Sequence, residues 1–481
     1  MPSPTRTAAH GTFALDEEHA ARLRAHVETA VRRARRRGSG VLATVTAALP
    51  RGADPTAIVV ASRGGGEPWT AFEQPARDGF ALASLGCAAA LEARGERRFA
   101  EVAALWRELA AHAVSDAADA PRGSGPVAVG GFAFAPDGGA APHWNAFAPA
   151  SLHVPQVALA RRGDEARLTL TALIQPDDDA DVVCESLLGR AAALRERPLP
   201  LLDPDPVGRY RVVSAMPPEH YAGAVARAVE RIRAGDLEKI VLAREVQVHA
   251  PASYDPAAVL GALRAAFTEC HVFCVARGDD AFVAASPELL VRRDGMRAGT
   301  LALAGSARRS ADPAVDAHLG EQLLRSPKDR EEQAIVTRRI VQALRAHSLW
   351  VTVADEPVLA RIANIQHLAT PIRAQLRDPV SVVELAGALH PTPAVGGEPL
   401  EVAAPLIPAL EGLDRGWYAG PVGWVDEHED GEFCVALRCA LLSGRVARCY
   451  AGVGVVRDSD PEAELAETEM KLGALLPVLA G

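Results

Sequence analysis

Residues 460–472, "DPEAELAETEMKL", combine acidic and basic side chains at a spacing that could do chemistry. On an α-helix, at about 100° per residue, Glu464, Glu467 and Lys471 share one stripe, and Leu475 continues it. A stripe that runs into leucine is poorly explained as the water-facing side of a helix. Salt pairing of the two glutamates with Lys471 accounts for the periodicity equally well. The stripe is therefore either a set of ion pairs or half of a site.

A second acidic segment, "SPKDREEQAIV" at 326–336, shows the same pattern. Ser326 is a favourable helix cap, and Asp329 stands where a capping box has an acid. Glu332 falls in line with Val336, on the side of the helix that should be buried. A buried carboxylate must be ion-paired, protonated or bound to a metal. Two helices that each direct carboxylates inward predict a site with oxygen ligands, which suits magnesium.

Two further ionisable residues lie beside apolar strands. Lys239 begins the predicted strand of "KIVLAREVQVHA", on the face that also carries Val241 and Ala243. A lysine at a strand start is usually solvated, whereas in a dry cleft its pKa would fall and it could act as a general base. Glu288, in "ASPELLVRRDG", lies between an apolar strand and a turn. It could stabilise the turn or, with a raised pKa, act as a proton donor.

Composition excludes several classes of protein. The 481 residues carry a formal net charge of −10 without a basic patch across a face, which argues against nucleic acid. No apolar run reaches the roughly 18–20 residues of a membrane span, and the first residues lack the build of a signal peptide. The seven cysteines include no CxxC pair, which argues against a disulfide framework and a zinc site. The sequence predicts a soluble cytoplasmic protein.

Helix and strand signals predict an α+β protein with mixed sheets. A proline-rich segment, 197–210, predicts a linker between residues 1–205 and residues 206–481. Helices are predicted near 16–37 and 97–113. The segments "VLATVTAAL", "TAIVVAS", "VAVGGFAFAP" and "ARLTLTAL" predict short strands, and "GEFCVALRCALL" with "RVARCYAGVGVV" predicts a hairpin. No glycine-rich phosphate loop joins a strand to a helix, so no nucleotide site is predicted.

The motifs taken together resemble those of chorismate-utilising enzymes, and isochorismate synthases in particular. They occur in the family's order: "KIVLAREV", "ASPELLVRRDG", "LALAGSARR", "SPKDREEQAIV", "NIQHLATPI", "HPTPAVGGEP", "YAGPVGW", "GEFCVALRCALL", "YAGVGVV" and "DPEAELAETEMKL". The resemblance covers about 210–481 strongly and the first part only loosely, through "GGFAF". It implies one large fold of sheets sandwiched between helices, with the linker inside a single body.

The resemblance also implies roles for the acids and the lysine. Glu332 and Glu464 would be direct magnesium ligands, and Asp329 and Glu467 would act through metal-bound waters. Lys239 would activate a water that attacks chorismate at C2, while Glu288 would protonate the departing C4 hydroxyl. The product would be isochorismate. The substrate pocket implied by the resemblance is formed by Gly305, Ser306, His367, Arg438, Tyr450, Gly452, Gly454 and Lys471.

Arg438 and Tyr450 would anchor the enolpyruvyl carboxylate, with backbone N–H groups near Gly452 and Gly454 close to it. Lys471 would lie near the ring carboxylate and the metal. From local sequence alone, Arg438 could equally be an outward ion-pair partner and His367 a satisfied core histidine.

Departures from related families narrow the expected activity. Anthranilate synthases lack a lysine at the position of Lys239, and aminodeoxychorismate synthases carry a nucleophilic lysine where this chain has Ala304. No glutaminase subunit is therefore expected, and the family default is a monomer. Two alternatives stay open: a salicylate synthase, which also eliminates pyruvate from isochorismate, and a catalytically silent chorismate-binding protein.

Overall fold

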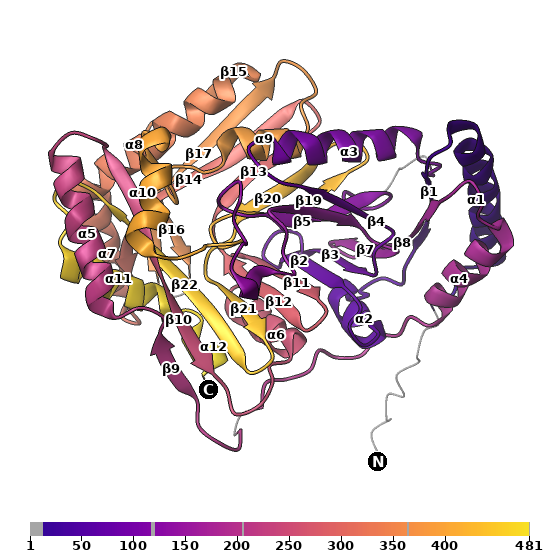
Figure 1. Cartoon of the computed structure of the whole chain (residues 1–481), viewed down its shortest axis with the longest axis horizontal. Helices are drawn as coiled ribbons and strands as arrows, with labels where there is room; N and C mark the ends of the chain where they lie inside the picture. The colour runs from indigo at the N-terminus through magenta and orange to yellow at the C-terminus, as the bar shows by residue number, and fades with distance from the viewer. Residues whose placement is uncertain (1–12, 117–120, 204–205, 363–364, 481) are drawn as a thin grey trace.

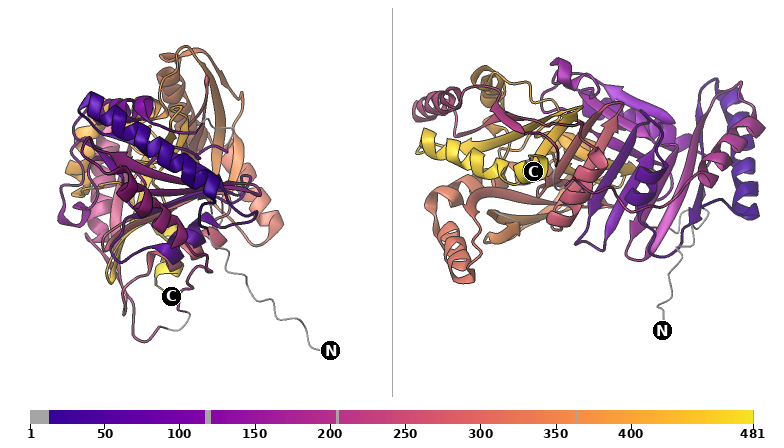
Figure 2. Two further views of the ribbon diagram at one scale, coloured as in Figure 1. Left: turned by 90° about the vertical axis from the view of Figure 1, so that its right-hand side faces the viewer. Right: turned by 90° about the horizontal axis from the view of Figure 1, so that it is seen from below.

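The computed structural model describes residues 13–116, 121–203, 206–362 and 365–480. Two antiparallel β-sheets form its centre, and helices cover their outer faces and ends (Figures 1 and 2). The predicted α+β class is confirmed. Part of the predicted linker, residues 204 and 205, lies outside the described residues.

The first sheet has 12 strands in the described part of the chain. Their spatial order is β1 (Val41–Ala48), β8 (Glu165–Ile174), β7 (Val157–Arg162), β3 (Phe80–Leu85), β2 (Trp69–Gln74), β11 (His271–Arg277), β12 (Asp280–Ser286), β21 (Cys439–Ser443), β22 (Val446–Val455), β10 (Lys239–His249) and β18 (Gly397–Glu398), with β9 (Arg211–Ser214) also on β10. The pairing of β2 with β11 joins the two halves of the chain.

The second sheet has 10 strands within the described ranges. Their spatial order is β15 (Ser348–Val353), β17 (Ile365–Leu376), β14 (Arg297–Arg308), β13 (Leu289–Asp294), β20 (Gly431–Val435), β19 (Pro421–Asp426), β5 (Val127–Phe132), β6 (Ala150–Val154) and β4 (Ala89–Ala93), with β16 (Val358–Ile362) also on β17. Here β5 pairs with β19, so both halves of the chain contribute to both sheets.

Two apolar cores hold these layers together. The larger contains buried residues from both sheets, such as Phe273 of the first and Phe433 of the second. The other packs α1 (Glu17–Arg37), α2 (Pro55–Ser62), α4 (Ala180–Ala192), α6 (Pro256–Ala266) and α12 (Leu476–Leu479) on the first sheet. No helix within the described ranges is long and apolar enough to cross a bilayer.

Most local predictions are confirmed, but one predicted strand is wrong and one predicted hairpin is only partly right. The predicted helices correspond to α1, which ends at Gly38 with φ 69°, and to α3 (Arg98–His112). The segment "TAIVVAS" forms α2 rather than a strand. Asp54 caps this helix by accepting from Thr56 N, and Pro55 takes its first position. The cap and the proline therefore outweigh the β-propensity of Ile58 and its valine neighbours.

The predicted hairpin is only half right, and the difference shapes the site. β21 and β22 pair as expected, but "GEFCVALRCALL" is not one strand. Its first part is β20, in the second sheet, and its last part is β21, in the first sheet. The chain thus crosses between sheets at 436–438, where Arg438 has φ 46°.

Candidate active site

Two crossings between the sheets bring the acid Glu288 and the cation Arg438 close together. β12 lies in the first sheet and β13 in the second, and Glu288 lies between them. Arg438 lies in the neighbouring crossing, which runs in the opposite direction from β20 to β21. Val435 N donates to Glu288 O at 2.9 Å, and Ala285 N donates to Arg438 O at 3.1 Å. Backbone hydrogen bonds therefore hold the two crossings together.

Lys239 lies at the start of β10, completely buried. Its Nζ is 2.8 Å from Oε1 of Glu332, on α8 (Pro327–Arg345). Gly454 of β22 makes room for this pair, because a Cβ there would lie 2.5 Å from Glu332 Oε1 and 2.8 Å from Lys239 Cε. Burial would raise the pKa of Glu332, but the charge of Lys239 holds it below the usual value.

A bulge in β14 positions the start of α8. Ala304 pairs with Leu368 and Ser306 with His367, so Gly305 is the extra residue, with φ 67°. Glycine is required at this position for two reasons. Its left-handed backbone conformation disfavours other residues, and a Cβ would lie only 2.9 Å from Asp329 Oδ1. As predicted, Ser326 caps α8, its side chain accepting from Asp329 N.

The acidic stripe of α11 (Pro461–Leu472) faces the same cavity. Glu464 is buried and Glu467 half-buried, while Glu462 and Glu469 are exposed. The stripe is therefore not the water-facing side of the helix. Lys471 fits both the ion-pair and the site interpretation of the stripe. Its Nζ lies 3.0 Å from Glu467 Oε1, as an ion pair requires, and it also donates to Gly452 O, at the cavity, at 2.9 Å.

Lysine is almost absent from this chain, and its few copies gather here. The 51 basic side chains include only three lysines, Lys239, Lys328 and Lys471. Each is paired with a different carboxylate, Lys328 with Glu464 at 3.1 Å. All three lysines therefore lie at this cavity, where each compact ammonium group meets a carboxylate, together with Arg438.

All the predicted site residues except Lys239 line this one cavity. Lys239 lies directly behind it, against Glu332 and Gly454. Those that line the cavity are Glu288, Gly305, Ser306, Asp329, Glu332, His367, Arg438, Tyr450, Gly452, Gly454, Glu464, Glu467 and Lys471.

Burial gives Glu288 the properties of a proton donor. It raises the pKa of Glu288 to about 7, against the positive charges of Lys239, Arg438 and Lys471. The side chain is 6% exposed. A carboxyl group with this pKa is substantially protonated at neutral pH, which a general acid requires.

Arg438 presents a buried guanidinium group with no carboxylate partner in the described part of the chain. Its Nη2 donates to His367 Nε2 at 2.9 Å. Nδ1 of His367 then carries the ring proton and donates to Gly305 O at 2.9 Å. Burial lowers the pKa of His367 to about 3, so the ring is neutral. A buried cation without an anion is suited to a substrate carboxylate.

Tyr450 closes another side of the cavity. Its ring stacks between Trp144 and Tyr418, with centroids 5.9 and 5.2 Å away. Its buried hydroxyl has no hydrogen-bond partner among the described residues, and so is free to bind a ligand. Gly452 beside it gives Tyr418 room, because a Cβ would lie 2.7 Å from the Tyr418 hydroxyl.

Side chains replace a missing strand along the edge of β10. β18 pairs only with its first two residues and β9 with its last four. Between them, Val241 O accepts from Arg415 Nη2 at 3.0 Å, and Ala243 N donates to Glu411 Oε1 at 2.7 Å. Arg415 Nη1 also donates to Val395 O at 2.8 Å. This buried ion pair therefore fixes the strand that carries Lys239 to a segment that lines the cavity.

Replacing Arg415 with methionine is expected to lower the free energy of unfolding by about 3–5 kcal/mol, because it leaves Glu411 buried without a counter-charge. Chemical denaturation would measure it. The matched control is Arg338→Met, which breaks an exposed pair with Glu238 and should cost no more than about 1 kcal/mol. Equal losses in the two variants would contradict a structural role for the buried pair.

The carboxylates fit a magnesium site in their chemistry. They supply only oxygen ligands, from two facing helices. Burial raises the pKa of Asp329 and of Glu464, and the repulsion of neighbouring carboxylates adds to it. Within the described ranges no three histidine, cysteine or acidic side chains are grouped as metal ligands, and each lysine instead lies on one carboxylate. A cation at these acids would relieve their repulsion.

Sequence reasoning missed Lys328, Glu411, Arg415 and Tyr418. Lys328 had a signal, because lysine is so rare in this chain. The others depend on side-chain bonds to a strand edge and on ring stacking, which no spacing in the sequence predicts.

Comparisons with known proteins identify the family of this chain. The family model described as "Chorismate binding enzyme" matches residues 29–480. The chain is 40% identical over 417 residues to the salicylate biosynthesis isochorismate synthase of Pseudomonas aeruginosa, covering 86% of this chain and 85% of that protein. It is 34% identical over 393 residues to the isochorismate synthase MenF of Bacillus subtilis, covering 81% and 82%.

A solved structure shows the same architecture. MenF, the menaquinone-specific isochorismate synthase from Escherichia coli, superimposes with a TM-score of 0.76 at 27% identity, covering 94% of this chain and 100% of that one. With the family model spanning nearly the whole sequence, the chain belongs to the chorismate-binding enzymes.

Proposed function

We propose that the protein is an isochorismate synthase, an isomerase that converts chorismate to isochorismate. The observation that carries the proposal is the buried Glu288, with a pKa raised to about 7, in a cavity that also meets a buried lysine and an unpaired arginine. The names of the relatives support the same activity.

Lys239 and Glu288 would divide the proton transfers. Lys239 would take a proton from the water that attacks C2. Glu288 would donate its proton to the C4 hydroxyl, which leaves as water while the ring double bonds shift. Atoms balance, since one water enters and one leaves. The charge of Lys239 acts on the pKa of Glu288, which supports placing both side chains at one substrate.

The charges of the site would orient the substrate. Arg438, held by the neutral His367, would receive the enolpyruvyl carboxylate, and the Tyr450 hydroxyl would donate to it. A magnesium ion held by Glu332 and Glu464 would supply positive charge for the ring carboxylate. Because the nucleophile is water, no ammonia-producing subunit is needed.

The Glu332→Gln variant is expected to bind magnesium at least about tenfold more weakly, since loss of one carboxylate removes both a ligand and a charge. Titration calorimetry with magnesium chloride, without substrate, would measure this. Glu331→Gln is the matched control, because Glu331 is the exposed neighbour on the same helix. An unchanged magnesium titration in Glu332→Gln would remove Glu332 from the ligand set.

The activity itself is tested by incubating the protein with chorismate, with and without magnesium, and identifying the products by chromatography with mass detection. Isochorismate formed only with magnesium is the expected result. Salicylate and pyruvate would instead indicate a salicylate synthase. Unconsumed chorismate would indicate a silent binding protein, and either result would overturn the proposal.

A further inference from the structure

A second, larger cavity lies on the other side of the segment 390–399. Its volume is about 910 Å³, which is within the range of small-molecule sites. The first turn of α3, the chain after β5, and α10 (Leu400–Glu411) form its walls. His390 and Pro391 face this cavity, whereas Ala394 and Val395 face the candidate active site. The two cavities therefore share one wall without sharing a lining residue.

A buried guanidinium group lies at the inner end of this cavity. Arg98 is 4% exposed, and its Nη groups donate only to backbone oxygens, including Ala133 O at 3.1 Å. Its Nε has no hydrogen-bond partner, and no carboxylate lies within ion-pair distance of it among the described residues. Arg98 also opens α3, a helix of 15 residues whose N-terminus has no side-chain cap. Both features favour an anion.

His390 presents an acceptor beside that cation. Its Nε2 donates to Phe134 O at 2.9 Å, so Nδ1 carries a lone pair. Nδ1 is buried and has no partner in the part of the chain that the structure describes. Burial lowers the pKa of His390 to about 3, so the ring stays neutral. A ligand with an O–H or N–H donor would satisfy this atom.

The walls between these two polar groups are aromatic and apolar. The rings of Phe99 and Phe134 lie 5.9 and 5.7 Å from the His390 ring, and Phe134 meets it edge-on at 89°. Ala404 and Pro405 of α10 line the opposite side. Such walls suit a flat ring better than a flexible polar chain.

The mouth of the cavity limits the charge of a ligand. Glu96, Asp137 and Glu401 line it and are exposed, and the half-buried Arg339 also lines it. The three acids outnumber this cation, so a ligand with one anionic group, held by Arg98, fits better than one with several.

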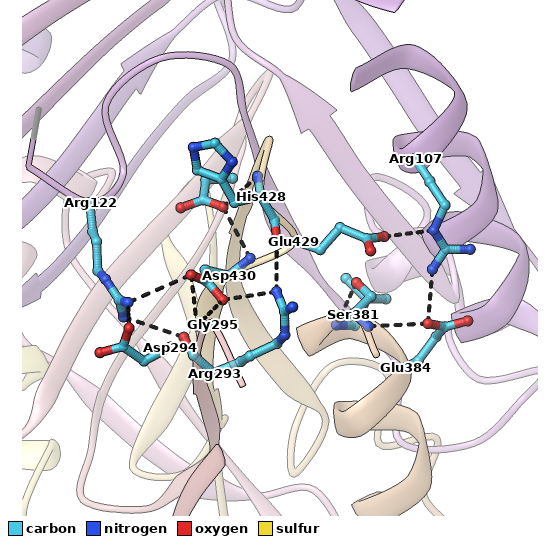
Figure 3. Close-up of polar contacts among 12 residues, drawn as sticks. Arg107, Arg122, Arg293, Asp294, Gly295, Ser381, Glu384, His428, Glu429 and Asp430 are labelled. Carbon is cyan, nitrogen blue, oxygen red and sulfur yellow. Dashed lines mark hydrogen bonds and ion pairs between the residues drawn. The ribbon is translucent and has the colours of Figure 1, made fainter. Parts of the chain in front are cut away.

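Contacts at the far end of α3 attach this helix to the β19–β20 turn and to α9. Arg107 bridges Glu429, in the β19–β20 turn, and Glu384, on α9 (Val382–Leu389), both at 2.9 Å (Figure 3). Trp106 Nε1 donates to Asp426 O at 2.9 Å. At the first turn, Arg98 donates to Ala133 O and Phe134 O, so both ends of α3 are tied to neighbouring elements.

We propose that this cavity binds a small aromatic monocarboxylate that also carries a hydroxyl or amine donor. The carboxylate contacts Arg98 and the first turn of α3, the donor contacts His390 Nδ1, and the ring packs against Phe134 and the α10 side of the cavity. Arg415 connects this site to the active site, because its guanidinium lies 4.2 Å above the Phe134 ring and donates to Val395 O.

Titration calorimetry of the full chain with 3-hydroxybenzoate tests the proposal without relying on catalysis. Benzoate lacks the donor and 3-hydroxybenzyl alcohol lacks the carboxylate, so benzoate should bind more weakly and the alcohol not at all. Equal affinity for all three probes, or no binding of 3-hydroxybenzoate, would overturn the proposal.

Two variants locate the bound probe. Ala404→Trp places a large ring at the mouth of the cavity and should abolish binding, because Ala404 is an exposed lining residue. Ala409→Trp, at an exposed position on the same helix outside the lining, is the matched control and should bind like the wild type. Arg438→Gln should also retain binding. Loss of binding in Arg438→Gln with retention in Ala404→Trp would place the probe in the active site and overturn the proposal.

Discussion

The Lys239→Met variant is expected to lower kcat by about 10²–10⁴-fold, which is the usual contribution of a general base. Methionine keeps much of the buried apolar stem but has no group that can accept a proton. Steady-state kinetics with chorismate would measure the loss, and circular dichroism would establish that the fold remains. A variant with wild-type turnover would remove Lys239 as the base.

Lys239→Arg separates the charge of this side chain from its basicity. Arginine can still pair with Glu332, but its guanidinium group stays protonated at any accessible pH. We therefore expect turnover as low as in Lys239→Met. Substantial activity in Lys239→Arg would show that Lys239 acts as a fixed positive charge.

Glu288→Gln is expected to lower kcat by a similar factor of about 10²–10⁴, because the amide has nearly the same shape but no acidic proton. Binding of substrate should change much less, since Arg438 remains in place. A loss confined to KM would instead identify Glu288 as a binding group.

The pH dependence of the wild-type enzyme tests the same residue. Burial raises the pKa of Glu288 to about 7, so its protonated fraction falls as the pH rises through that value. A general acid must be protonated to act, so kcat/KM should fall above about pH 7, by about tenfold per pH unit. The residual activity of Glu288→Gln should lack this limb. A limb that persists unchanged in the variant would belong to another group.

The sequence predicted which residues meet at the site better than it predicted how they are held. The stripe of Glu464 and Glu467 and the inward position of Glu332 follow from helical periodicity, which is local and regular. Their pairing with three lysines is a tertiary property. It could be predicted only in part, from the rarity of lysine in the chain.

The crossings between sheets were not predictable from local patterns. "GEFCVALRCALL" is buried nearly throughout and is apolar apart from Gly431, Glu432 and Arg438, so its pattern is that of one continuous buried strand and does not reveal the change of sheet at 436–438. The positive φ of Arg438 arises from that crossing. Similarly, Glu411 and Arg415 lie in the sequence like an ordinary helical ion pair, and only the open edge of β10 gives them their role.

The most direct test of the central claim is the reaction of chorismate in water enriched in oxygen-18. Attack of water at C2 with loss of the C4 hydroxyl predicts isochorismate that carries one labelled oxygen, on C2, in every molecule formed by the forward reaction. Isochorismate without the label would mean that the hydroxyl moves within the substrate. Lys239 would then have no water to activate, and the mechanism would be wrong.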